Sequence, residues 1–79
     1  MPHKAWKITI EEKTHIIEVR WEIWTTSGQL LVDNKVIDAW GPSLTGGGAR
    51  HFEVANKPAI LQSTAWSYKL FVDGKEIKS

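Results

Sequence analysis

Apolar and polar residues alternate along most of this chain. Trp6, Ile8 and Ile10 are separated by single polar residues, which is the period of a strand with one buried face. The stretch from His15 to Trp24 has the same period. We expect one set of its alternate positions to face the core, namely His15, Ile17, Val19, Trp21 and Ile23. No window shows the i, i+3, i+4, i+7 apolar stripe of a helix without a better strand interpretation, so the pattern predicts an all-β protein with essentially no helix.

Two short segments, forty residues apart, have nearly the same sequence. Residues 32–37 read Val-Asp-Asn-Lys-Val-Ile, and residues 72–77 read Val-Asp-Gly-Lys-Glu-Ile. Asp-Asn and Asp-Gly tolerate the positive φ angles of a two-residue type I′ loop, so both segments predict tight β-hairpins. Within the first hairpin, the cross-strand pairs expected from such a loop are Val32 with Lys35, Leu31 with Val36, and Leu30 with Ile37.

A weaker repeat precedes each of these hairpins. Residues 8–18 match residues 52–62 at an offset of 44, apolar for apolar. The repeat predicts a further hairpin in each half of the chain, turning near Lys13 in the first and at Asn56-Lys57-Pro58 in the second.

The two repeats divide the chain into similar units. We place the units at about residues 4–40 and 50–79, with a flexible, glycine-rich join at 41–49. Each unit exposes one apolar face, and two such faces can bury each other. The sequence therefore predicts a small antiparallel β-sandwich of seven to eight strands, built from two pseudo-repeated hairpin units, in a single domain over residues 1–79.

Composition and charge narrow the functions open to the chain. Its 79 residues leave no length for a second core. Five Trp residues help so small a core, because each ring can bury about 150–250 Å². A net charge of +1 with interleaved signs gives no nucleic-acid footprint, and the absence of Cys excludes disulfides and thiol chemistry. The N-terminus lacks an apolar signal segment and no run is long enough to span a membrane, so we expect a cytoplasmic protein with no membrane partner.

Several short motifs, taken in order, resemble one known family. They are His15-x-Ile17-Glu18, Thr25-Thr26-Ser27-Gly28, Val32-Asp33-x-Lys35-x-Ile37, Trp40, Phe52-x-Val54, Tyr68-x-Leu70 and Val72-x-Gly74-Lys75-x-Ile77. Together they cover nearly the whole chain, and in this order and spacing they resemble a domain of the Fas apoptotic inhibitory molecule family.

The resemblance implies a binding module. Members of that family in animals are tandem antiparallel β-sandwich domains that act through protein contacts, and the family has no catalytic residues to transfer. This chain departs from the pattern in having one domain, and in having glycines at 41 and 46–48, with Pro42, where the family continues a strand. Only the scaffold is therefore transferred, and an apoptosis-related role is not.

No group of residues predicts a reaction centre, a metal site or a cofactor. His3, His15 and His51 have no metal-ligand spacing, and Ser27, His15 and Asp38 lack the strained setting of a nucleophile. The segment from Gly46 to Arg50 lacks the lysine and helix of a phosphate loop, and the turns already explain Asp33 and Asp73. We expect a protein that is not an enzyme and takes no small-molecule ligand.

Apolar residues at positions assigned to solvent give the candidate interaction surface. They are Ile16, Trp24, Leu31, Val36 and Phe71. A contiguous patch of this kind marks a protein partner or self-association, whereas a bulge or a sheet edge would bury some of its members. The alternative function is a carbohydrate-binding module, in which exposed Trp24, Trp40 or Trp66 stack on sugar rings.

Overall fold

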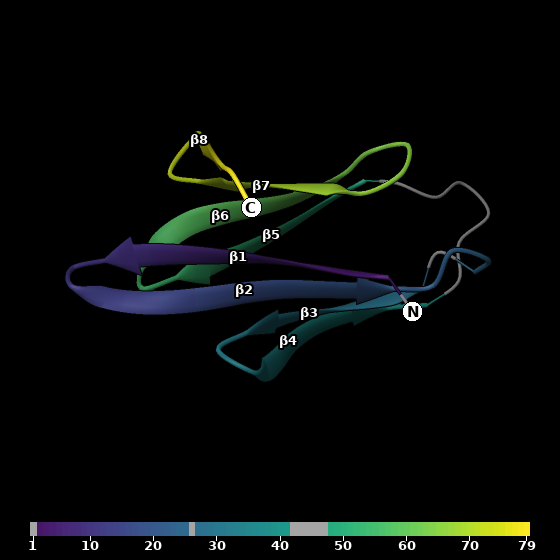
Figure 1. Cartoon of the computed structure of the whole chain (residues 1–79), viewed down its shortest axis with the longest axis horizontal. Coiled ribbons are helices and arrows are strands. Elements are labelled where there is room, and N and C mark those ends of the chain that lie inside the picture. Colours follow the sequence, from purple (N-terminus) through teal and green to yellow (C-terminus); the bar gives the residue numbers. More distant parts are fainter. Residues whose placement is uncertain (1, 26, 42–47) are drawn as a thin grey trace.

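A computed structural model of the chain describes residues 2–25, 27–41 and 48–79. This part of the chain contains eight strands and no helix, which confirms the predicted all-β class (Figure 1). The strands are β1 (His3–Ile10), β2 (Lys13–Trp21), β3 (Gly28–Val32), β4 (Lys35–Trp40), β5 (Ala49–Val54), β6 (Lys57–Ser63), β7 (Tyr68–Val72) and β8 (Lys75–Ile77). They form two antiparallel four-stranded sheets, in the orders β1-β2-β3-β4 and β5-β6-β7-β8.

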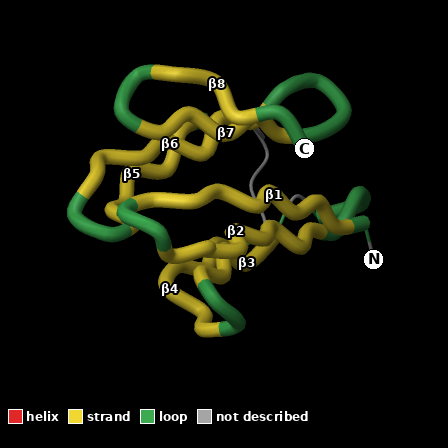
Figure 2. Tube along the Cα trace, turned by 60° about the vertical axis from the view of Figure 1, so that its left-hand side comes forward, coloured by secondary structure: helices red, strands yellow, loops and turns green. Residues whose placement is uncertain are grey.

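Each sheet is one of the predicted pseudo-repeated units. In both, four consecutive strands pair with their neighbours in chain order, so every connection within a sheet is a simple antiparallel turn or loop. Figure 2 shows the two sheets as separate layers, one above the other. Of the join that we predicted at 41–49, residues 42–47 fall outside the described residues, and β5 already begins at Ala49.

All four two-residue turns have the positive φ angles of type I′ loops. Asp33-Asn34 and Asp73-Gly74 turn the chain as predicted, with φ values of 52° and 69° in the first and 52° and 82° in the second. The other two turns are Glu11-Glu12 and Ala55-Asn56. The turn predicted at Asn56-Lys57-Pro58 is therefore one residue earlier in the chain, and β6 already begins at Lys57.

Side chains from both sheets form one core between the layers. Alternate residues of β1, β2, β6 and β7 point inward, as the period of two requires. The buried members of this core are Trp6, Ile8, Ile17, Val19, Leu30, Val54, Ala59, Leu61, Leu70 and Val72. Of the set predicted to face the core from residue 15 onward, Ile17 and Val19 are fully buried. Ile23 is 67% exposed, because β2 ends at Trp21 and the alternation has no ladder to continue on.

A β-bulge in β4 changes the predicted pairing of the first hairpin. Val32 opposes Lys35 and Leu31 opposes Val36, as expected, but Leu30 opposes Asp38 instead of Ile37. Ile37 is the extra residue, and a bulge of this kind reverses the facing of the positions that follow it. Asp38 consequently lies opposite the buried Leu30, on the inner side of the sheet. In the second hairpin, Leu70 opposes Ile77 without interruption.

Candidate functional site

The structure separates the five residues of the predicted interaction surface. Ile16 and Val36 are 45% and 47% exposed, but Leu31 between them is only 5% exposed. Leu31 is absent from the core between the sheets, and its cross-strand neighbours are Glu18 and Val36. The expectation that Leu31 lies open to solvent is wrong, since its neighbours on the outer face of a twisted, bulged sheet cover it.

Phe71 cannot share a surface with Leu31. It is half-buried on β7, between the inward-pointing Leu70 and Val72, and therefore faces away from the core. The outer faces of the two sheets point in opposite directions, so a side chain on one is far from a side chain on the other. The predicted surface is therefore not one patch, and its most exposed member is Trp24, at 93%.

An aromatic cluster closes one end of the sandwich. The ring of Trp21, at the end of β2, lies 5.0 Å from that of Tyr68, at the start of β7, in an edge-to-face arrangement. Trp40, at the end of β4, lies 6.3 Å from the same tyrosine. Lys4 on β1 donates a hydrogen bond from Nζ to the Tyr68 carbonyl oxygen at 3.1 Å. All four strands that supply these residues meet here, so the cluster joins the two sheets.

A bidentate ion pair extends this cluster to the other edge of the sandwich. Arg50 on β5 donates from Nε and Nη2 to the two Asp38 carboxylate oxygens at 2.9 and 3.1 Å. Its guanidinium also lies 4.8 Å from the ring centre of Trp40, within cation–π range. The bulge at Ile37 makes this contact possible, because it turns both Asp38 and Trp40 inward.

Three residues at this end of the sandwich have shifted pKa values. The hydrogen bond from Arg50 lowers the pKa of Asp38 below its ordinary value of 3.8, and the same pair raises the pKa of Arg50. Burial raises the pKa of Tyr68, although a hydrogen bond with Trp40 and the charge of Arg50 partly oppose this. Each shift follows from packing and pairing that hold the sheets together, so none of them by itself indicates acid–base chemistry.

Gly28 allows the Trp40 ring to lie where it does. A Cβ atom at this position would meet the backbone oxygen of Arg20 at 2.7 Å and Cζ2 of Trp40 at 2.7 Å. Gly28 pairs with Trp21 on one side and with Trp40 on the other. The missing side chain is therefore what lets Trp40 cross the end of β3 and reach Tyr68.

Two loops at this same end present unsupported tryptophans. Trp24 is 93% exposed in the β2–β3 loop, and Trp66 is 91% exposed in the β6–β7 loop. Both loops leave the sheets at the end where Trp21 meets Tyr68, and both views place them on the same side of the molecule (Figures 1 and 2). In the part of the chain that the structure describes, neither indole has a recorded ring contact, and Ile23 beside Trp24 is 67% exposed.

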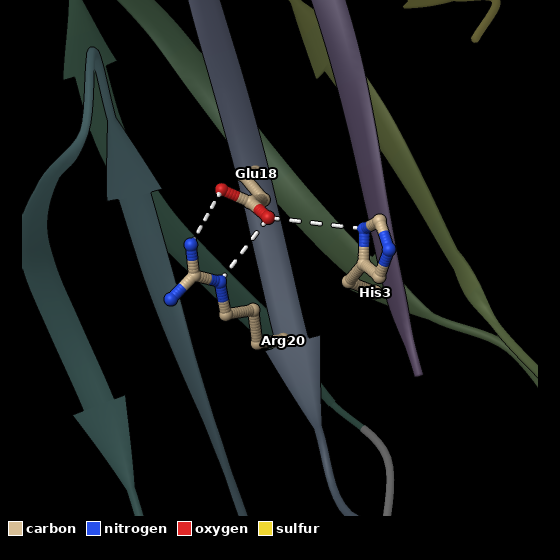
Figure 3. A network of polar contacts seen from close by, with 3 residues as sticks. All are labelled: His3, Glu18 and Arg20. Carbon is tan, nitrogen blue, oxygen red and sulfur yellow. Dashed lines mark hydrogen bonds and ion pairs between the residues drawn. The ribbon is translucent and has the colours of Figure 1, made fainter. Parts of the chain in front are cut away.

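A polar network lies on the outer face of the first sheet, next to this end (Figure 3). Arg20 donates from Nε to Oε2 of Glu18 at 3.1 Å and from Nη2 to Oε1 at 3.3 Å. Nδ1 of His3 lies 3.8 Å from Oε2 of the same carboxylate. Glu18 therefore holds the guanidinium in one orientation.

A shallow hollow of about 320 Å³ opens beside Arg20. It lies at the base of the β2–β3 loop, next to the small side chain of the exposed Ala39. Its lining comprises Arg20, Trp21, Glu22, Ser27, Gly28, Gln29, Ala39 and Trp40. Sequence reasoning missed this hollow, because it depends on residues from three strands whose pairing is set by the bulge.

The other candidate residues do not converge. Nδ1 of His15 hydrogen bonds Oδ2 of Asp33 at 2.8 Å, near the β3–β4 turn, whereas Ser27 lies at the opposite end of β2 and β3 and Asp38 pairs with Arg50. The described residues contain no group of three or more His, Cys, Asp or Glu side chains placed to hold a metal ion. In the glycine-rich segment, Gly46 and Gly47 lie outside the described residues. Arg50, at the end of that segment, forms an ion pair with Asp38.

Comparisons with known proteins do not assign this chain to a family. No protein-family model matches the sequence, and a search of curated proteins gives no match. Over the described residues, no helix is long and apolar enough to cross a membrane. Functional conclusions for this chain therefore depend on its own residues.

Proposed function

We propose that this chain is a non-enzymatic protein-interaction module that binds its partner through the loop end of the sandwich. The observation that supports this proposal is the exposure of Trp24 and Trp66 at 93% and 91%. An exposed indole leaves about 150–250 Å² of largely apolar surface in water. Two of them on loops at one end of the sandwich are typical of anchors that a partner buries, and Trp is enriched among the residues that dominate binding energy.

The geometry of these indoles favours a protein partner over the predicted carbohydrate platform. A flat stacking platform needs a ring with one face supported by the protein, so that the other face can meet the sugar. A ring that is more than nine-tenths exposed has both faces in solvent and projects from the surface. Such a ring fits into a pocket of a partner, and Ile23 extends the same apolar loop.

The resemblance to the Fas apoptotic inhibitory molecule family agrees with this proposal in kind, since that family acts through protein contacts. It does not supply the binding surface, because the residues that make up the resemblance lie mostly in strands and turns. The proposed surface instead consists of Ile23, Trp24 and Trp66, and it replaces the strand-face residues Leu31 and Phe71 of the sequence-based prediction.

The test compares two double variants. Trp24→Ser with Trp66→Ser removes the loop anchors, and Ile16→Thr with Val36→Thr changes exposed strand residues of the first sheet. Once a partner has been captured and identified, calorimetry with the purified pair should show a loss in affinity of about 30-fold or more for the loop variant, because two anchors worth about 1 kcal/mol or more each are removed. The strand variant should bind within about threefold of wild type.

Sedimentation of the chain alone completes the test. If wild type self-associates at high concentration and the loop variant is monomeric, the partner is a second copy of this chain. Equal binding by the loop variant and wild type would refute the proposal, and so would a loss of binding confined to the strand variant.

A further inference from the structure

The hollow beside Arg20 opens on the outer face of the first sheet. Arg20, Gln29 and Ala39 lie in one cross-strand row over β2, β3 and β4, and all three are exposed. Arg20 and Gln29 point away from the core, because their strand neighbours Val19 and Leu30 are fully buried on the inner side. The volume of the hollow, about 320 Å³, is at the lower end of the range for binding pockets. It has room for one large side chain but not for a longer segment.

A protruding indole stands beside this hollow. Glu22 and Ser27, which line the hollow, are the two ends of the β2–β3 loop. A backbone hydrogen bond of 2.9 Å from the Glu22 N–H to the Ser27 carbonyl oxygen closes the loop at its base. Trp24 projects from this loop with 93% of its surface exposed, so it does not enter the hollow of its own chain. One surface therefore carries a large side chain without a pocket and, next to it, a pocket without a side chain.

Arg20 can receive an aromatic ring in the hollow. Its Nε and Nη2 atoms donate to Glu18 (Figure 3). The N–H bonds of a guanidinium lie in its plane, so this pairing fixes the group and leaves its flat face available for stacking. Trp is the best aromatic partner for such a cation–π contact. The small side chain of Ala39, in the same row, leaves space for the ring.

We propose that two copies of this chain associate about a two-fold axis, with Trp24 of each copy in the hollow beside Arg20 of the other. The inference rests on the proposed function, because it uses the same loop end, and it specifies the partner as a second copy. A protrusion and a hollow side by side on one surface can be exchanged in a closed pair, since a two-fold interface contains every contact twice. Trp66 belongs to the second sheet and is not needed for this exchange.

The charges at the rim of the hollow agree with an exchange between copies. Arg20 and Glu22 have opposite charges and both line the hollow. Arg20 is paired with Glu18, and Glu22 forms no ion pair within the part of the chain that the structure describes. A two-fold axis beside the hollow reverses the order of the two charges, so that Arg20 of one copy meets Glu22 of the other. Such rim pairs orient the partners more than they add affinity.

The area of this contact sets the expected affinity. Each inserted indole buries about 150–250 Å² and covers a similar area of the hollow, so two insertions bury about 600–1,000 Å² in total. Stable interfaces bury about 1,200–2,000 Å², and smaller ones are weak and transient. We therefore expect a reversible dimer with a dissociation constant of about 10 μM to 1 mM.

Sedimentation equilibrium from about 10 μM to about 2 mM covers this range. The mass of wild type should rise from the 9.0 kDa of one chain toward twice that value and stop there. Trp24→Ser removes the indole, and Ala39→Phe fills the hollow while keeping the backbone N–H that bonds Asp38. Each should weaken the dimer at least about tenfold, because the symmetry places each change in the interface twice.

Two matched variants serve as controls. Trp66→Ser removes the other exposed loop indole, and Ala5→Phe enlarges an exposed alanine of β1, away from the hollow. Both should dimerise within about twofold of wild type. Circular dichroism confirms that each variant is folded.

A mixed sample of isotope-labelled and unlabelled chains identifies the contact itself. In filtered NMR spectra, the ring protons of Trp24 in one copy should show a nuclear Overhauser effect to the methyl group of Ala39 in the other. The same signal should be absent from Trp24→Ser.

Three results would overturn the inference. The first is a chain that stays monomeric at about 2 mM. The second is an unchanged dimer in Trp24→Ser or in folded Ala39→Phe, and the third is a mass that rises beyond that of a dimer. None of these refutes the proposed function, which fails separately if a captured partner binds the double loop variant as tightly as wild type.

Discussion

The two sheets of this protein have the same strand order but differ in four places. Those differences shape the end of the sandwich that carries the aromatic cluster. The β1–β2 hairpin extends beyond the β3–β4 turn by two residue pairs more than the β5–β6 hairpin extends beyond the β7–β8 turn. Ile17 of β2 opposes Val32 at the end of β3, whereas Ala59 of β6 opposes Val72 at the end of β7. The loop at residues 22–27 is also longer than the one at 64–67. Because the first sheet has these insertions, the offset between matching residues of the two units falls from 44 in the first repeat to 40 in the second.

The remaining two differences lie in β3 and β4. The first sheet has a bulge at Ile37 and a glycine at position 28, whereas the second has an unbroken β7–β8 ladder and Tyr68 at the equivalent position. Only the first sheet can therefore turn Asp38 and Trp40 inward and leave space for the Trp40 ring. The repeat supplies the scaffold, and the departures from it supply the ion pair, the aromatic cluster and the hollow.

Among the tests of this comparison, we expect a substitution at Gly28 to have the largest effect on stability. Gly28→Ala places a Cβ atom 2.7 Å from a backbone oxygen and from the Trp40 ring, so either the strand or the ring must move. We expect a loss of about 1–3 kcal/mol in the free energy of unfolding, as for other overpacked sites. Urea denaturation followed by circular dichroism measures it.

Gly41→Ala is the matched control, because nothing lies within 4 Å of the Cβ atom it would add. Its effect should be within about 0.5 kcal/mol of zero. Equal stability of the two variants would show that the Trp40 ring does not need the space above Gly28.

The bulge is tested by two equivalent isoleucines. Ile37, the extra residue, is 42% exposed, whereas Ile77 packs against the core from an unbroken ladder. Ile77→Thr should cost about 1 kcal/mol or more because it removes buried apolar groups, and Ile37→Thr should change stability by no more than about 0.5 kcal/mol. Chemical denaturation of both variants at one pH gives the comparison, and a larger cost at Ile37 would mean that this residue faces the core as a regular hairpin requires.

The ion pair at the bulge should give the smallest effect, seen as a dependence on pH. The pKa of Asp38 is lower in the folded protein than its ordinary value of 3.8, mainly because Arg50 donates to it. Its stabilising effect is therefore complete above that value and is lost as the pH falls through the folded pKa. Asp38→Asn should be less stable than wild type at pH 7, and the two unfolding free energies should converge in acid.

The difference between these two proteins isolates Asp38. The pKa of Asp33 is also lowered, by the backbone hydrogen bond from Ile16 and by His15, but Asp33 titrates in both proteins and cancels. A constant gap between wild type and Asp38→Asn at every pH would show that the pair does not depend on the charge of Asp38.

Sequence reasoning reached the scaffold because the scaffold is a local property. Alternation in segments such as Trp6–Ile10 and the Asp-Asn and Asp-Gly turns each report a strand or a turn from a few adjacent residues. The repeat then gives the number of sheets. These signals correctly predicted both hairpins and the all-β class.

The end of the sandwich could not be predicted in the same way. Whether Asp38 and Trp40 face in or out depends on one extra residue in β4, and nothing in Val36-Ile37-Asp38 marks which residue bulges. The burial of Leu31 depends on its neighbours in β2 and β4 rather than on its own parity. Trp24 was placed correctly at the surface, but that its loop lies on the same side of the molecule as the β6–β7 loop follows only from how the two sheets lie together.

The inward-facing charges also have a consequence for behaviour at high concentration. Lys4 on β1, Asp38 on β4 and Arg50 on β5 each direct a charged group toward the inner side of an outermost strand, and β8 is only three residues long. A strand from another molecule that docked edge to edge would have to bury these ions or break their bonds. These features disfavour fibril growth from the four edge strands. We therefore expect a solution of the protein to show no turbidity when it is concentrated or gently heated.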